Sequence, residues 1–321
     1  MTTQQATAAP VRERLVRLVD RAVRAPSPYN TQPWRFRLCG DAVELYADRS
    51  RALPATDPDG RELLLACGAA LAHLRIAAPA AGTRADIVVL PDPGRPDLLA
   101  RVRLDGPVHP DWVTLALAGA IPRRHTNRLL FDGRPVPADL VTELVELARA
   151  DGAALFRVPA TPLADLIARG AHRRAADPAM RQEAAAWTHA GHDAGRDGIA
   201  GAAIGTAPRQ VTRELPHADR AAAADLARWE TAATLLVLAT DTDAVAERLA
   251  AGQALARVLL RATVDGVASS FFGAPLAVPE LRRAVRERAG LLGQPQLLLR
   301  LGYAPAAPLS PRRPVRHVLT G

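Results

Sequence analysis

The stretch APSPYNTQPWRF, residues 25–36, marks a junction between two different patterns in the chain. It holds three prolines, which fix the backbone φ angle and remove amide donors, so it predicts a stiff loop. Before it, apolar residues at helical spacing predict a helix over residues 11–24, which Pro26 ends. After it, WRFRLCGDAVELYAD alternates around a Gly-Asp turn and predicts a β-hairpin. The twelve positions of the stretch fit neither a helix nor an ordinary strand.

Composition limits the classes of function. The chain has 321 residues, 49% of them hydrophobic, which suits one large domain or two fused halves. It contains no lysine, so the 41 basic residues are all arginine, and the formal net charge is +8. Arginine and acidic residues alternate along the predicted helices, which indicates a general arginine bias and no nucleic-acid partner. The surplus arginines still provide candidates for binding an anionic ligand.

The sequence carries no clear signal for export, membrane insertion or metal binding. The N-terminus lacks an apolar signal core, and the run LLLACGAALA is too short to span a bilayer. Cys39 and Cys67 show neither a disulfide framework nor zinc-ligand spacing, and His189 and His192 lack partner ligands. We therefore expect a cytoplasmic protein with no metal and no membrane partner.

Helix and strand patterns recur along the chain. Helices are predicted over 61–78, 138–150 and 244–266, and strands in RADIVVLPD, LLARVRL, AALFRV, ATLLVLAT and QPQLLLRLGYA. GAALAHLRIAAPAAG (68–82) aligns without a gap on GQALARVLLRATVDG (252–266). The alignment alone is weak because alanine is common here, but each copy follows one strand and precedes another. The sequence therefore predicts an α+β protein of two similar halves.

Two arginine-rich segments could hold an anion. RRHTNR, residues 123–128, offers donors suited to phosphate oxygens, and SPRRPVRHV, residues 310–318, is similar. From the residues alone, a solvated basic loop and a basic tail remain open as alternatives. No dinucleotide fingerprint, P-loop, GxSxG or cysteine-nucleophile motif occurs. We therefore expect a bound cofactor to carry any chemistry.

These segments together resemble the nitroreductase superfamily. APSPYNTQPWRF resembles its flavin-facing loop, RRHTNRLLFDGRPVP its arginine motif, and GVASSFFGAP its late Gly/Ser turn. LLLRLGYAPAAPLSPRRPV resembles its C-terminal Gly-Tyr strand with a basic phosphate clamp. The resemblance implies an α+β fold with central antiparallel sheets flanked by helices. It also implies FMN as cofactor, NAD(P)H as electron donor and a small nitroaromatic or quinone-like molecule as electron acceptor.

The order of the motifs differs from that of an ordinary family member, in which each subunit carries both motifs and two subunits build two flavin sites. Here residues 1–120 keep the flavin-facing loop, and residues 121–321 keep the arginine motif. The chain thus resembles the stress- and dormancy-associated actinobacterial branch, which implies a fused pseudo-dimer with one composite flavin site. We expect a monomer, with further dimerisation left open, and region 170–215 is the candidate lid over the flavin.

The resemblance also implies residue roles by position. The loop would lie along the isoalloxazine ring, the arginine motif and the C-terminal arginines would hold the phosphate, ribityl chain and pyrimidine edge, and two serines would face the reactive edge. The implied FMN-binding residues are Pro26, Ser27, Pro28, Asn30, Gln32, Arg124, His125, Thr126, Arg128, Ser269, Ser270, Arg312 and Arg313. No catalytic side chain is expected, because the flavin carries the hydride. The alternative function is an FMN-binding or storage protein whose lid blocks NAD(P)H.

Overall fold

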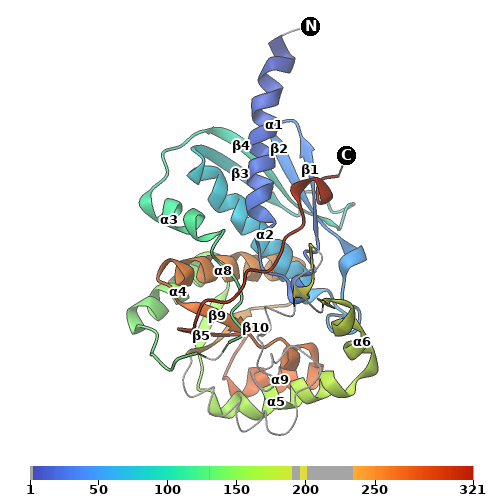
Figure 1. The fold of residues 1–321 in the computed structure, drawn as a ribbon, viewed down its shortest axis with the longest axis vertical. Helices are drawn as coiled ribbons and strands as arrows, with labels where there is room; N and C mark the ends of the chain where they lie inside the picture. The colour runs from blue at the N-terminus through green and yellow to red at the C-terminus, as the bar shows by residue number, and fades with distance from the viewer. Residues whose placement is uncertain (1–2, 130, 190–195, 201–233, 321) are drawn as a thin grey trace.

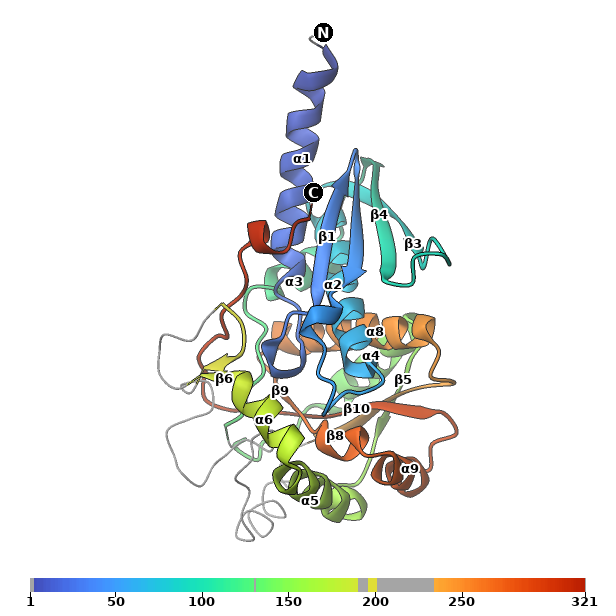
Figure 2. The ribbon, with the colours of Figure 1, turned by 90° about the vertical axis from the view of Figure 1, so that its right-hand side faces the viewer.

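The computed structural model describes residues 3–129, 131–189, 196–200 and 234–320. Two antiparallel sheets, each accompanied by helices, form the two halves of the molecule, and two long helices lie between them (Figure 1). The quarter-turn view in Figure 2 shows the same order, with the N-terminal half above the second half. The α+β fold predicted from the sequence is confirmed.

The first half contains the predicted hairpin. Helix α1 (Thr3–Ala22) precedes β1 (Trp34–Cys39) and β2 (Ala42–Ala47), which turn at Gly40 with a left-handed φ of 60°. Helix α2 (Arg61–Ala80) follows, and then β3 (Thr83–Val89) and β4 (Leu98–Pro107). The four strands are antiparallel and lie in the order β1-β2-β4-β3. The faces of α1 and α2 that pack against the sheet are apolar, so this half has its own hydrophobic core.

The second half repeats this topology. Helix α4 (Ala138–Ala150) precedes β5 (Ala154–Arg157) and β8 (Thr234–Thr240), and α8 (Val245–Val264) precedes β9 (Ala268–Phe271) and β10 (Gln294–Gly302). The antiparallel order is β5-β8-β10-β9. Each sheet therefore has the strand order 1-2-4-3, with its long helix between the second and third strands.

Helices α2 and α8 pack against each other through two glycines. A Cβ on Gly68 would lie 2.2 Å from the Leu249 oxygen, and a Cβ on Gly252 would lie 2.1 Å from the Leu65 oxygen. Only glycine permits this approach of two backbones. The contact is reciprocal, and the two glycines occupy the same position in the aligned segments 68–82 and 252–266. The predicted internal repeat therefore corresponds to the two helices at the centre of the fold.

A long insertion separates the first two strands of the second sheet, where the first sheet has only a tight turn. It contains α5 (Thr161–Ala176), α6 (Pro178–Ala186), β6 (Thr188–His189) and β7 (Ile199–Ala200). Of the candidate lid 170–215, residues 190–195 and 201–215 lie outside the described residues. Helix α6 and strand β6 lie beside the loop that follows α1 (Figure 2).

The C-terminal segment runs from the second half back to the first. The Phe36 amide of β1 donates to the Val318 oxygen (2.8 Å), and the Thr320 amide donates to the Phe36 oxygen (2.8 Å). The end of the chain thus covers the β1 edge of the first sheet (Figure 1). In space, residues beyond β10 accompany the first half, although in sequence they end the second.

The remaining elements are short. They are α3 (Trp112–Ala120), α9 (Pro279–Arg288) and the 3-10 turns at Pro28–Asn30, Arg49–Arg51, Ala274–Ala277 and Val315–His317. Cys39 and Cys67 are free thiols. In the described part of the chain, α2 is the one helix long and apolar enough to cross a membrane, but 83% of that stretch is buried inside the fold. We interpret α2 as a core helix.

Candidate functional site

The loop between α1 and β1 has a strained backbone. Tyr29, Asn30 and Gln32 have φ angles of 46°, 55° and 51°, in the left-handed region that favours glycine. They are three of the four such non-glycine residues in the described chain. The Ser27 oxygen accepts from the Asn30 amide (3.0 Å), and the Ser27 Oγ accepts from the Gln32 amide (3.0 Å). Strain of this kind persists where the surroundings impose it, typically at functional sites.

Two amide side chains tie this loop to distant segments. Both are buried, and the Asn30 Nδ2 donates to the Gly198 and Pro311 oxygens (3.0 Å each). The Gln32 Nε2 donates to the Arg196 oxygen (2.9 Å), and the Gln32 Oε1 accepts from a C-terminal backbone amide. Because the amide hydrogens of Asn30 are both bonded within the chain, this side chain holds the loop in place.

Two predicted phosphate ligands meet at the start of the same loop. The Arg124 Nη2 and the Arg312 Nη2 both donate to the Arg24 oxygen, at 3.4 and 3.3 Å. Arg312 also bonds the Asn30 Oδ1 (3.0 Å). The Arg124 Nε and Nη1 and the Arg312 Nε are buried without a hydrogen-bond partner in the described structure. The fold thus brings Arg124 of the second half and Arg312 of the C-terminal segment onto the loop of the first half.

The charges around this arginine pair are all positive. Burial and the neighbouring Arg128 lower the pKa of Arg124 to about 10. Burial, together with Arg124 and Arg24, lowers the pKa of Arg312 to about 9. Among the described residues, no carboxylate forms an ion pair with Arg124 or Arg312. Buried guanidinium groups without a counter-ion are costly, so the chemistry of the site suits an anionic ligand.

Other residues of the two basic motifs lie apart from this pair. Arg313 donates to the Gln32 oxygen (3.3 Å) and to the His317 oxygen (2.6 Å), and lies 4.0 Å from the Asp48 carboxylate. Arg313 therefore holds the loop through Gln32, whereas Arg312 lies beside Arg124. The half-exposed His125 contacts the Arg123 oxygen through Nδ1 (2.8 Å). Of the arginines in the RRHTNR segment, Arg124 is buried, Arg128 is half-buried and Arg123 is exposed.

The serines lie in a strand, not in the turn expected from the sequence. Ser269 and Ser270 belong to β9, which pairs with β10, and both are buried. The segment forms a strand because β10 pairs with one edge of it and the arginine motif pairs with the other. Thr126 bridges Ser269, and the Asn127 amide donates to the Ser269 oxygen (2.8 Å). This pairing sets the arginine motif beside the two serines, and Asn127 is a positioning residue absent from the predicted set.

The described part of the insertion is fastened over the loop region. The Glu183 carboxylate accepts from the Ala55 and Thr56 amides (3.0 and 2.9 Å) and from the Thr56 hydroxyl. Arg51 pairs with Asp197, and its guanidinium lies 5.1 Å from the Trp187 ring centre. Together with the bonds from Asn30 and Gln32 to residues 196–198, these contacts close one side of the site.

His73 on α2 was not expected from the sequence. It is fully buried, its Nδ1 lies 3.0 Å from the Arg21 oxygen, and its Nε2 has no hydrogen-bond partner in the described structure. Burial, with Arg124 as the strongest neighbouring charge, lowers the pKa of His73 to about 3. The neutral ring therefore adds no charge to the cluster. A lone histidine on an alanine-rich helix has no sequence signal that distinguishes it from a core residue.

The fold has two sheets with the same 1-2-4-3 strand order. Its candidate site combines a strained loop with two arginines that have no acidic partner among the described residues. The sequence model of the nitroreductase family matches residues 121–303. The chain belongs to the nitroreductase family, and the oxidoreductase class expected from the sequence is confirmed.

The relatives include proteins of similar length from Mycobacterium tuberculosis. "Putative NAD(P)H nitroreductase Rv3131" of Mycobacterium tuberculosis (strain ATCC 25618 / H37Rv) is 37% identical over 311 residues, covering 93% of this chain and 88% of the relative. "Uncharacterized protein Rv3127" of the same strain is 33% identical over 319 residues, covering 93% and 90%. Among solved structures, the FMN and NADPH-dependent nitroreductase NfnB from sphigopyxis sp. strain HMH aligns with a TM-score of 0.43 and 18% identity, covering 64% of this chain and 98% of that one.

Proposed function

We propose that this protein is an FMN-containing, NAD(P)H-dependent reductase that delivers hydride to nitroaromatic or quinone-like acceptors. The observation that carries the proposal is the arginine pair, Arg124 and Arg312, which meets on one carbonyl oxygen with no acidic partner in the described chain. The name of the mycobacterial relative Rv3131, a putative NAD(P)H nitroreductase, agrees with this function.

The residues present fit FMN. Its terminal phosphate is a dianion, and two guanidinium groups with buried unbonded N–H groups match the geometry and charge of phosphate oxygens. Arg124 and Arg312 would hold the phosphate, the backbone of residues 26–30 would lie along the ring, and Ser269 and Ser270 would lie near its reactive edge. A single phosphate needs no dinucleotide motif, and the sequence has none.

The chain's contribution is binding and orientation. When bound, FMN supplies the redox chemistry, accepting hydride from a nicotinamide and passing it to an electron-poor acceptor. The strained loop is already ordered by its bonds to residues 196–198 and 311–313, so little ordering cost remains when a flat ring binds. The contacts of Glu183 and Asp197 keep the insertion over the loop and exclude water from that side.

The same insertion supports a second candidate function, storage of FMN. Its residues 196–198 bond directly to Asn30 and Gln32, in the loop that would face the ring. An insertion that stays closed would prevent a nicotinamide from stacking on the flavin. The two functions share the cofactor and differ in whether the insertion opens during turnover.

The cofactor and the electron donor can be tested on the purified protein. Heat-released cofactor should run as FMN by chromatography, and FAD as the main species would contradict the assignment. Anaerobic addition of NADH or NADPH should bleach the flavin absorbance if the protein is a reductase. For a storage protein, dithionite would bleach the flavin absorbance, but neither NADH nor NADPH would.

We further propose that the chain is a fused pseudo-dimer that binds one FMN. Its boundary near residue 120 lies between α3 and the arginine motif, and the two halves share one topology. Each half contributes one of the two flavin motifs, so their union builds one site. Flavin absorbance measured against protein concentration should saturate at one FMN per chain. A reproducible ratio near two would mean that a second complete site exists.

A further inference from the structure

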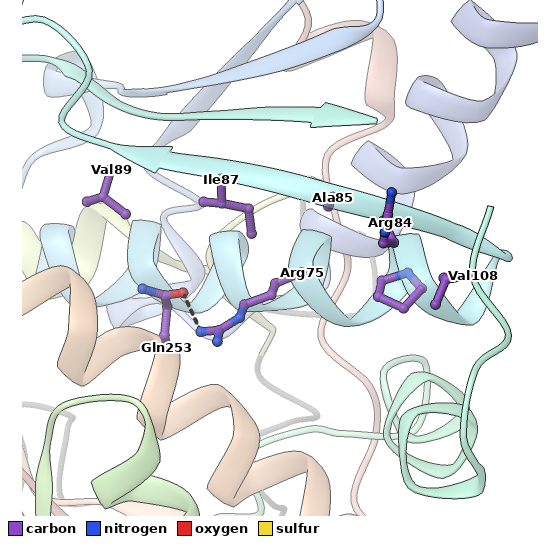
Figure 3. Close-up of a pocket in the computed structure, with 8 residues that line it drawn as sticks. Arg75, Arg84, Ala85, Ile87, Val89, Val108 and Gln253 are labelled. Atoms are coloured by element: carbon purple, nitrogen blue, oxygen red, sulfur yellow. Dashed lines mark hydrogen bonds between the residues drawn. The ribbon is translucent and has the colours of Figure 1, made fainter. Parts of the chain in front are cut away.

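A pocket of about 540 Å³ lies against β3 of the first half, near the end of α4 of the second half, as the arginine site lies against β9 of the second half, near the end of α1 of the first. The arginine site lies against β9, the third strand of its sheet. The pocket lies against β3, the third strand of the other sheet, and is closed below by α2 and α8 (Figure 3). The duplicated topology therefore relates the two sites, one on each side of the paired glycines of α2 and α8.

The pocket has a different charge arrangement from the arginine site. Asp151, at the end of α4, is fully buried, and its Oδ1 accepts from Arg75 (3.1 Å) and Arg257 (3.0 Å). At the related end of α1, the Arg24 carbonyl oxygen accepts from Arg124 and Arg312, and neither guanidinium has an acidic partner among the described residues. A buried carboxylate repels a phosphate dianion, so this pocket is not a second FMN site.

The cluster around Asp151 carries one positive charge in excess. Two guanidinium groups share one carboxylate, and within the described chain they have no second acidic partner. Arg75 is half exposed, with 49% of its side chain open, and also lies 3.5 Å from the Gln253 Oε1. If Arg75 turns toward a ligand, Arg257 still neutralises Asp151. The excess charge therefore suits a ligand with a single negative charge.

The rest of the pocket is apolar. Ala85, Ile87 and Val89 alternate along β3 and form its roof, above the side chains of Arg75 and Gln253 (Figure 3). Pro79 and Val108 close one end. The guanidinium of Arg84, at the same end, is bonded to Asp105. The volume is within the range of small-molecule sites, and a guanidinium beside an apolar slot is the usual recognition of a flat carboxylate.

We propose that this pocket binds a small apolar monocarboxylate, with its carboxylate on Arg75 and the Gln253 amide and its apolar body under β3. The two related positions of the pseudo-dimer would then hold different ligands. This site is separate from the flavin site, so its ligand should bind without contacting the flavin.

The test uses the FMN-loaded protein and 2-naphthoate as the probe, with 2-naphthylmethanol as an uncharged analogue. Calorimetric titration should give one saturable naphthoate site, with an unchanged flavin spectrum and no comparable binding of the alcohol. Arg75→Met should weaken naphthoate binding at least tenfold, because it removes charge-assisted hydrogen bonds. Arg103→Met is the matched control: Arg103 is also half exposed and ion-paired, but with Asp86 outside the pocket, so its loss should change nothing.

Two further variants protect the test against a folding defect in Arg75→Met. Gln253→Leu should weaken the same binding, and Ile87→Asp should abolish it by placing a negative charge in the roof. Absence of saturable binding, equal binding by Arg75→Met, or a naphthoate-induced change in the flavin spectrum would each overturn the proposal. A spectral change would locate the probe at the flavin. Flavin content, measured in every sample, reports the proposed cofactor function separately.

Discussion

Replacing Arg124 by methionine should change the stability of the FMN-free protein and its affinity for FMN in opposite directions. Burial and Arg128 lower the pKa of this guanidinium from 12.5 to about 10. At about 1.4 kcal/mol per tenfold change in proton affinity, the fold destabilises the charged form by about 3 kcal/mol. Methionine keeps an apolar stem of similar reach and removes the charge.

The FMN-free variant should therefore be more stable than the parent protein. The hydrogen bond from Arg124 to the Arg24 oxygen is lost, which costs about 1 kcal/mol, so the net gain is about 2 kcal/mol. For a chain of this size that gain corresponds to a rise of a few degrees in Tm. FMN affinity should fall about ten- to a hundredfold, because charge-assisted hydrogen bonds to the phosphate contribute about 1.5–3 kcal/mol.

Both quantities are measured on FMN-free protein prepared by mild denaturation and refolding. Thermal unfolding without FMN gives the stability, and quenching of flavin fluorescence during titration gives the dissociation constant. Arg123→Met is the control, because Arg123 is the exposed neighbour and bonds only the Gly119 oxygen of its own helix end. A less stable FMN-free variant with unchanged FMN affinity would refute the reasoning, since Arg124 would then be a structural residue without a ligand.

Three other perturbations test separate features of the fold and site. Arg312 has a pKa of about 9 in the fold, so between pH 9 and 12.5 the unfolded chain keeps a proton that the folded chain has released. The stability of the FMN-free protein should therefore rise with pH while its affinity for FMN falls. Thermal unfolding and FMN titration at pH 7.5 and 9.5 check this, and a constant FMN affinity would contradict it. Gly252→Ala should destabilise the protein by about 3 kcal/mol in urea unfolding, because the new Cβ would lie 2.1 Å from the Leu65 oxygen. Gly119→Ala is the control and should leave the stability unchanged, because a Cβ there has no heavy atom within 4 Å. Glu183→Gln weakens the fastening of the insertion to the Ala55 and Thr56 amides, so NADPH should reduce the flavin faster in stopped-flow absorbance, and an unchanged rate would argue against opening at this contact.

The pattern of apolar residues was sufficient to predict most of the sheet strands and the two central helices. Strands β3, β4, β8 and β10 and helix α8 lie within a few residues of their predicted ranges, because each is buried on at least one face and its period shows in the sequence. Helix α1 begins earlier than residue 11, and α3 and α9 were not predicted. The sequence predicted a turn at β9, because its four residues are too few to show an alternation.

The candidate site also has features that the sequence predicted and features that it did not. The loop 25–36 and the segment 123–128 could be singled out by composition, because prolines and clustered arginines act on the backbone and on charge locally. The different partners of Arg312 and Arg313 could not be predicted, since the two residues are neighbours in sequence. Arg312 meets Arg124 on the Arg24 oxygen, and Arg313 bonds Gln32.

The sequence by itself determined most of the sheet strands, the two central helices and the family, because these depend on periodicity, repeated glycines and local motifs. Only the tertiary structure decided which side chains become buried together. Arg124 and His73 are buried beside the half-buried Arg312, and Asp151 is buried at the end of α4 against Arg75 of α2 and Arg257 of α8. Burial determines the cost of a charge, and neighbours determine whether it is compensated, so the difference between the two related sites arises from contacts between residues far apart in the chain.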